Sequence, residues 1–121
     1  MARYVFVVLT NASGGRDDEF NDWYNGRHIP DVLQIPGFVA AQRFRLADAQ
    51  MNDMSSPWRY LALYEIETAD LAGALKELTA RVGTPAMVMS DTLNMEGIGA
   101  YVFAPIAERV VAGQARPAGK A

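Results

Sequence analysis

The sequence predicts a single α+β domain in which strands and helices follow one another in the order β-α-β-β-α-β. Three observations lead to this prediction: four short runs of β-forming residues, two segments with apolar residues at the i, i+3, i+4 spacing of a helix face, and Gly- or Pro-containing breaks between them. A chain of 121 residues has the length of one domain with one core. The order is the ferredoxin-like split βαβ pattern, a four-stranded antiparallel sheet with both helices on one face.

The predicted strands contain continuous apolar stretches where alternation would be expected. They cover residues 3–10, 38–46, 58–66 and 98–104. In the first and third strands, the runs VFVVL and YLALY are apolar on both faces, although a sheet with one face in water alternates apolar and polar residues. Two helices cover only one face, so we expect a second copy of the chain to pack sheet on sheet against the other. The alternative is an ordinary central strand in a monomer.

Two amphipathic helices are predicted between the strands. The first begins near Asp17, which can cap it, and ends at Pro36-Gly37; the second is capped by Thr68 and ends at Gly83. The remaining segments are expected to be irregular, and the last to be a flexible tail outside the domain. These segments are 47–57, a Met-rich stretch at 84–97 that is expected to be partly helical, and the tail 106–121. The predicted domain therefore comprises residues 1–105.

Composition excludes several classes of function. The net charge is −3, the pI is about 5.0, and no cluster of Lys and Arg with interleaved aromatics suggests a nucleic-acid partner. No apolar run approaches the ~18 residues of a membrane span. The absence of Cys excludes disulfides and thiolate chemistry and fits the cytoplasm. One His without Cys cannot form the usual zinc sites, so we expect neither a metal nor a cofactor.

The first predicted helix is unusual in its second half. Asn25-Gly26 is poor helix material, and Pro30 lacks an N–H and clashes with the carbonyl of Gly26. Pro30 also disfavours helical angles at Ile29, so the helix is expected to be interrupted between Asn25 and Pro30, with His28 inside the interruption. Two interpretations remain open: His28 is a functional group, or it satisfies a broken turn while Pro30 begins a short second helix.

Residues near His28 on the same helix face could support its chemistry. Tyr24 lies four residues before it and Asp31 three after it. A carboxylate next to an imidazole fixes its tautomer, and a phenol can donate to a developing oxyanion. The aromatic stripe that includes Trp23 and Tyr24 is more often core than ligand-binding wall. Arg43 and Arg45 alternate on the second strand, which favours a solvated edge over a carboxylate-binding role.

The stretch EFNDWYNGRHIPDVLQIPGF resembles the EthD-like group of the dimeric α/β-barrel superfamily. The matching positions carry the group's W-Y-x-x-x-H-x-P and P-G pattern, with Ile35 in place of the usual Leu; they are Trp23, Tyr24, His28, Pro30, Pro36 and Gly37. The resemblance covers about the first 105 residues. It implies that two chains form a barrel from two four-stranded sheets, and that each subunit has a pocket between helices and sheet toward which His28 points.

The resemblance implies several kinds of activity. Relatives include polyketide cyclases, lactone isomerases, decarboxylases, cofactor-free quinone-forming monooxygenases and haem-degrading enzymes; the last carry their His on a later helix. We therefore expect a cofactor-independent lyase or isomerase acting on a small apolar, aromatic or lactone-like carbonyl compound. His28 would move the proton, Asp31 would orient His28, and Tyr24 would steady the enolate oxygen.

Further candidates complete the expected site. The expected pocket-wall residues are Trp23, Phe44, Tyr60, Tyr64 and Met87. Two other functions stay open: a non-enzymatic ligand-binding or stress-associated dimer, and a cofactor-free monooxygenase.

Overall fold

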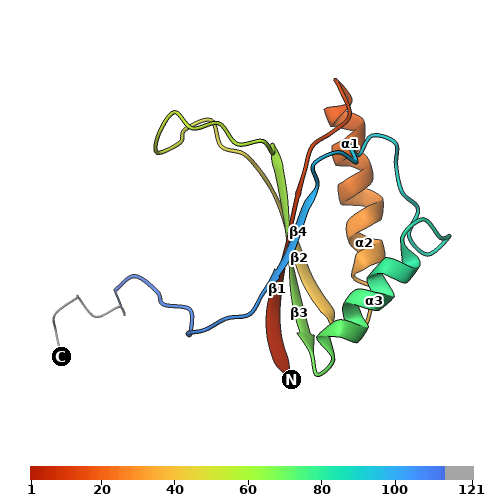
Figure 1. Cartoon of the computed structure of the whole chain (residues 1–121), viewed down its shortest axis with the longest axis vertical. Helices are drawn as coiled ribbons and strands as arrows, with labels where there is room; N and C mark the ends of the chain where they lie inside the picture. Colours follow the sequence, from red (N-terminus) through yellow and green to blue (C-terminus); the bar gives the residue numbers. More distant parts are fainter. Residues whose placement is uncertain (114–121) are drawn as a thin grey trace.

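The computed structural model of the chain describes residues 1–113 and shows the predicted order of elements (Figure 1). The elements are β1 (Ala2–Thr10), α1 (Asp17–Trp23), η1 (Tyr24–His28), α2 (Ile29–Val32), β2 (Phe38–Arg45), β3 (Tyr60–Thr68), α3 (Leu71–Arg81) and β4 (Gly99–Phe103). The sheet is antiparallel throughout, in the order β2-β3-β1-β4. The prediction of a ferredoxin-like α+β fold is confirmed. Residues 104–113 form no helix or strand, and the rest of the predicted tail lies outside the described residues.

The two helix starts differ from the predicted ones. The cap of α3 is Asp70, whose side chain accepts the N–H of Gly73 at 2.9 Å, whereas the Thr68 hydroxyl accepts the N–H of Asp70. In α1 no side chain caps the first turn, because the Asp17 carboxylate accepts the hydroxyl of Tyr60 at 2.6 Å instead. Both predicted caps are wrong for the same reason: a better-placed donor lies nearby in the folded chain.

The first helix is widened near Pro30 and is not interrupted. The segment η1 is a π-helical turn in which the N–H of Ile29 bonds the carbonyl of Tyr24, five residues earlier. Ile29 has φ −57° and ψ −51°, so the prediction that Pro30 pushes it away from helical angles is wrong. A wide turn accommodates the missing N–H and the bulk of the proline ring while keeping the chain helical. His28 is the last residue of this wide turn.

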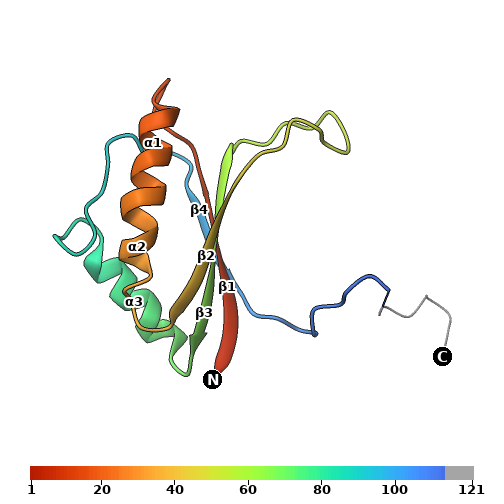
Figure 2. The ribbon, with the colours of Figure 1, turned by 180° about the vertical axis from the view of Figure 1, so that it is seen from behind.

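All helices lie on one side of the sheet. Figures 1 and 2 show α1, α2 and α3 on that side together with the segment between α3 and β4. The core is formed between these elements and the sheet residues that face them, and its fully buried members include Phe20, Val32, Ile35, Tyr64, Ile66 and Met87. Among the described residues, no helix is long and apolar enough to cross a membrane.

The other face of the sheet is rich in apolar side chains, although Gln42 and Glu65 also lie on it, and no helix within residues 1–113 covers it. Strand pairing sets Val7 opposite both Leu63 and Tyr101, and Val5 opposite Phe103. Tyr101 is 56% exposed and Phe103 is 55% exposed. We call this surface, made by Val5, Val7, Leu9, Phe44, Leu61, Leu63, Tyr101 and Phe103, the bare face. The loop between β2 and β3 and the segment after β4 both leave the sheet on this side (Figures 1 and 2).

Candidate functional site

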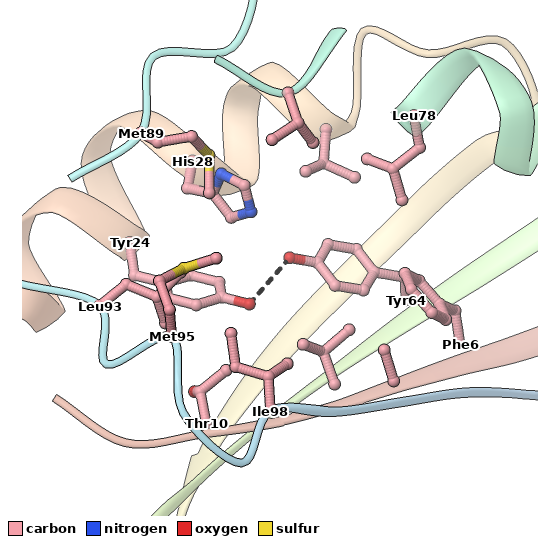
Figure 3. A pocket seen from close by; sticks show the side chains of 14 residues that line it. Phe6, Thr10, Tyr24, His28, Tyr64, Leu78, Met89, Leu93, Met95 and Ile98 are labelled. Atoms are coloured by element: carbon pink, nitrogen blue, oxygen red, sulfur yellow. Dashed lines mark hydrogen bonds between the residues drawn. The ribbon is translucent and has the colours of Figure 1, made fainter. Parts of the chain in front are cut away.

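A cavity of about 160 Å³ lies between the helices and the sheet (Figure 3). Its apolar lining comes from β1, β4 and the segment before it, α2, and the end of α3: Phe6, Val8, Val32, Leu78, Val82, Met89, Leu93, Met95, Ile98 and Ala100. The only other lining residues are Thr10, Tyr24, His28 and Tyr64. The cavity therefore suits an apolar body with one or two polar atoms, which is the common composition of small-molecule sites.

Two tyrosine hydroxyls meet inside the cavity. Tyr24 comes from η1 and Tyr64 from β3, and the hydroxyl of Tyr64 donates to that of Tyr24 at 3.3 Å. Burial raises the pKa of both tyrosines, so both are neutral hydrogen-bond donors over the ordinary pH range. The bond is long for an O–H···O contact, so either hydroxyl can turn toward a ligand at little cost.

The imidazole of His28 is held by aromatic rings. It stacks on Trp23 with ring centres 4.8 Å apart, and it meets the edge of Tyr24 at 4.9 Å. Its Nδ1 atom is buried and has no hydrogen-bond partner among the described residues. Figure 3 shows the imidazole and the two tyrosine hydroxyls converging on the same space. A buried polar atom without a partner is uncommon and often marks a functional group.

The His28 side chain is neutral near pH 7. Burial lowers the pKa of His28 to about 4; Asp31 opposes this shift, and Arg43 adds to it. A neutral imidazole can accept a proton from a ligand, whereas an imidazolium could not. The expected support of the protonated form by Asp31 is outweighed by desolvation.

Asp31 does not occupy the position that was expected. Its carboxylate pairs with Arg27, with 3.1 Å between Nε and Oδ2, and no hydrogen bond joins it to His28 in the described chain. Arg27 lies four residues before Asp31, the ordinary spacing of a helical ion pair, and it binds the carboxylate that was expected to reach His28. Asp31 therefore acts on His28 only through its charge, and the tautomer of His28 is not set by a carboxylate.

The expected pocket wall is only partly at the cavity. Tyr64 lines it, and Trp23 lies behind His28, where its indole N–H donates to the carbonyl of Val88 at 3.1 Å. Tyr60 points to Asp17, and Met87 is fully buried in the core without reaching the cavity. Phe44 lies on the bare face, since its strand partner is Leu61, and it is 44% exposed.

Sequence reasoning missed the residues that β1, α3 and the loop before β4 contribute. Phe6 stands opposite Tyr64 in the β1–β3 register, so pairing the two strands would have found it. Met89 was noted only as part of a Met-rich segment, and Leu78 only as core. No local pattern signals these residues, because they meet only when distant segments pack together.

The described residues do not fit a metal or a haem. No group of three His, Asp or Glu side chains within residues 1–113 could hold a metal ion. A cavity of about 160 Å³ is close to the ~150 Å³ of an engineered cavity that binds benzene, far below the size of a porphyrin. Its lining also offers no cation for the carboxylates of a haem.

The fold and the cavity define a class: a ferredoxin-like α+β domain with an apolar pocket between helices and sheet. Solved structures with this fold are similar to the chain over most of its length. An EthD-family protein from Bacillus halodurans has 17% identity and a TM-score of 0.58, covering 88% of this chain and 100% of that one. A dimeric ferredoxin-like protein of unknown function from Jannaschia has 12% identity and a TM-score of 0.62, covering 85% and 99%.

Other similar structures have different described activities. The heme-degrader MhuD of Mycobacterium tuberculosis, solved with two hemes in its active site, has 16% identity and a TM-score of 0.58, covering 88% of this chain and 99% of that one. Provisionally assigned monooxygenases also share the fold. No protein-family profile matches the sequence, and no curated protein matches it. The likenesses confirm the resemblance to EthD-like proteins at the level of fold.

Proposed function

We propose that this chain binds a small uncharged molecule in the cavity and moves a proton on it with His28. The observation that carries the proposal is the neutral imidazole, without a protein partner on Nδ1, beside two hydroxyl donors in an otherwise apolar cavity. The substrate class that fits is a single-ring carbonyl compound with an acidic C–H next to the carbonyl. The reaction class is isomerisation or a related lyase step.

The proposed step uses three side chains. The imidazole of His28 takes the proton from the carbon beside the carbonyl, and the electron pair of that C–H bond moves into the carbonyl group to form an enolate. The hydroxyls of Tyr24 and Tyr64 donate to the enolate oxygen, where charge develops. In a substrate with a C=C bond conjugated with the enolate, the imidazolium returns the proton to the far carbon of that system, which moves the double bond and leaves His28 neutral again. General base catalysis of this kind supplies about 10² to 10⁴ in rate.

The test is hydrogen exchange in a single-ring enolisable ketone, cyclohexanone, dissolved in D₂O. We expect the protein to accelerate exchange at the carbons beside the carbonyl, measured by NMR. His28→Gln keeps a hydrogen-bonding side chain but cannot accept a proton near neutral pH, so exchange should fall by at least about 10². His28→Ala should show the same loss of exchange as His28→Gln, and its melting temperature should stay close to that of the wild type.

Two outcomes would support other functions. Ketone binding with no acceleration of exchange would favour a non-enzymatic ligand-binding protein. Oxygen uptake with a single-ring phenol, measured with an oxygen electrode, would favour the cofactor-free monooxygenase, a second candidate because provisionally assigned monooxygenases share the fold. An active His28→Gln variant would contradict the proton-transfer mechanism.

The proposed working form is a homodimer that pairs the bare faces of two chains. The bare face is continuous across four strands, and an apolar surface of this kind marks an interaction site. A hollow of about 900 Å³ adjoins it, lined by Arg3, Phe103 and residues 104–109 among others. The loop between β2 and β3 and the segment after β4 extend on the same side, where each can reach a second copy (Figure 2).

A further inference from the structure

Arg43 is a partly buried cation with no carboxylate partner among the described residues. It extends from β2, and its two terminal nitrogens donate to the neutral amide oxygens of Asn25, at 2.9 Å, and Asn21, at 3.0 Å. Its Nε atom is buried and has no partner. Partly buried charges usually have a countercharge, so the arrangement leaves a positive charge available to act on its surroundings.

The guanidinium group lies over the ring of Tyr24. The distance from Cζ to the ring centre is 4.2 Å, shorter than the 5.4 Å to Phe20 and the 5.5 Å to Tyr60. The hydroxyl of Tyr24 is one of the two that meet in the cavity, 3.3 Å from that of Tyr64. The Arg43 charge thus acts on the cavity through a ring that it touches.

Two acidic groups of the helices on this side of the sheet have other partners. Asp17 accepts the hydroxyl of Tyr60 at 2.6 Å, and Asp31 pairs with Arg27. No acidic side chain lines the cavity, whose only titratable lining groups are His28, Tyr24 and Tyr64. The Arg43 charge lowers the pKa of Tyr24, although burial of that side chain has the larger, opposite effect. An anion on a ligand oxygen at the hydroxyl pair would therefore meet hydrogen-bond donors and an unneutralised cation behind them.

We propose that Arg43 is an electrostatic positioning residue that makes the Tyr24–Tyr64 hydroxyl pair the binding place for the oxyanion of a single-ring ligand. The preferred ligand is a phenol or enol with one acidic hydroxyl and an otherwise apolar body. The limit of one ring on the ligand follows from the cavity volume of about 160 Å³, since a cavity of ~150 Å³ holds benzene. This inference deepens the proposed function and rests on the same pocket, but it concerns binding and needs no turnover.

The test measures the pKa of bound 4-nitrophenol, whose phenolate is yellow and whose neutral form is not. Protein in excess is titrated with the dye present, and the absorbance of the phenolate gives the pKa in the pocket. Arg43→Gln removes the charge, so the pKa of the bound dye should rise by about one unit, as expected for a charge several ångströms away at an effective dielectric constant of about 20. Arg43→Lys should restore most of the wild-type value.

Two controls separate the charge from packing. Arg45→Gln removes the same charge from an exposed position on β2 and should leave the pKa of the dye unchanged. Asn25→Asp keeps Arg43 in place but supplies a countercharge, so it should raise the pKa of the dye as Arg43→Gln does. Toluene binding, measured by calorimetry, should be alike in all variants if the cavity is intact.

Equal pKa values for the dye in the wild type, Arg43→Gln and Asn25→Asp would overturn the role of Arg43. Toluene binding without any binding of 4-nitrophenol would overturn the ligand class. Neither result depends on His28. The ketone-exchange test of His28→Gln and the dye test of Arg43 can therefore give different answers.

Discussion

At the scale of single residues, the unusual property of His28 is that folding makes it harder to protonate. The imidazole is enclosed by Trp23, Tyr24 and the cavity, and burial outweighs the attraction of Asp31. The burial that keeps the imidazole unprotonated for the proposed proton transfer also makes this side chain a source of acid instability. The proposed function and the stability of the protein are therefore linked at His28.

The protein should lose stability as the pH falls from about 6.5 to about 4. The unfolded chain protonates His28 near 6.5 and the folded chain near 4, so the unfolded state binds more protons between these values. The contribution of neutral His28 is complete above 6.5 and decreases by about 2 to 3 kcal/mol by pH 4.5. Urea unfolding at pH 7 and pH 4.5 checks this.

His28→Gln provides the reference for that measurement. The carboxylates titrate in both proteins, so the difference between their pH dependences isolates His28. Identical losses of stability between pH 7 and pH 4.5 would show that His28 has an ordinary pKa in the folded state.

Tyr64→Phe should weaken phenol binding and leave toluene binding unchanged. It removes one hydroxyl from the pair in the cavity, and one lost hydrogen bond to a neutral ligand costs about 1 kcal/mol, or five- to tenfold in affinity. Calorimetric titration with phenol and with toluene measures both. Tyr60→Phe is the matched control: it removes the bond to Asp17, so it should lower the melting temperature without changing phenol affinity. Equal phenol affinity in Tyr64→Phe and the wild type would contradict the role of the hydroxyl pair.

At the scale of elements, the widened turn of the first helix carries two residues of the candidate site. Tyr24 and His28 are the first and last residues of the π turn, and both line the cavity. Single π turns inside helices occur often at functional sites. A local feature of the sequence, Pro30 after Asn25-Gly26, coincides with this turn.

Gly26→Ala should stabilise the protein by about 0.5 to 1 kcal/mol. Gly26 lies within η1 with an ordinary φ, and a Cβ there would have open space, so alanine reduces the entropy of the unfolded chain without a clash. The melting temperature should rise by a few degrees, measured by calorimetry. Gly73→Ala is the contrasting variant, because its Cβ would collide with the Asp70 carboxylate that caps α3. A lower melting temperature for Gly26→Ala would mean that the π turn requires glycine.

At the scale of the whole molecule, the bare face carries large exposed apolar side chains, and the proposed dimer would bury them. Light scattering at micromolar concentration should give about twice the chain mass of 13.2 kDa. Val7→Asp places a charge at the centre of the bare face, opposite Leu63 and Tyr101, and should convert the dimer to a monomer. Ala72→Asp, at an exposed position of α3 on the opposite side of the sheet, should leave the dimer intact. A wild-type protein of 13.2 kDa in solution would contradict the sheet-on-sheet dimer.

The sequence predicted the order and type of the four strands and of the two helical segments because each carries a local signal, whereas the π turn η1 was expected to be an interruption of the helix. Strands such as β1 are runs of β-formers, and the Gly and Pro breaks between elements are explicit. Element boundaries were less predictable. The start of β3 is Tyr60, not Trp58, because the N–H and carbonyl of Trp58 both bond the Ser56 hydroxyl, and the residue is thereby kept in the loop. Such a short-range bond competes with the strand ladder and leaves no periodic signal.

The sequence by itself determined the fold class, the two apolar faces of the central strands and the position of His28 beside a proline in the first helix. Only the tertiary structure decided which groups surround His28. Arg43 reaches Tyr24, and Phe6 faces Tyr64, because pairing of β2 and β1 with β3 brings them together. Asp31 pairs with Arg27, four residues earlier on the helix, and not with His28. Local patterns report secondary structure and burial, whereas the electrostatics of a site depend on distances between segments far apart in the chain.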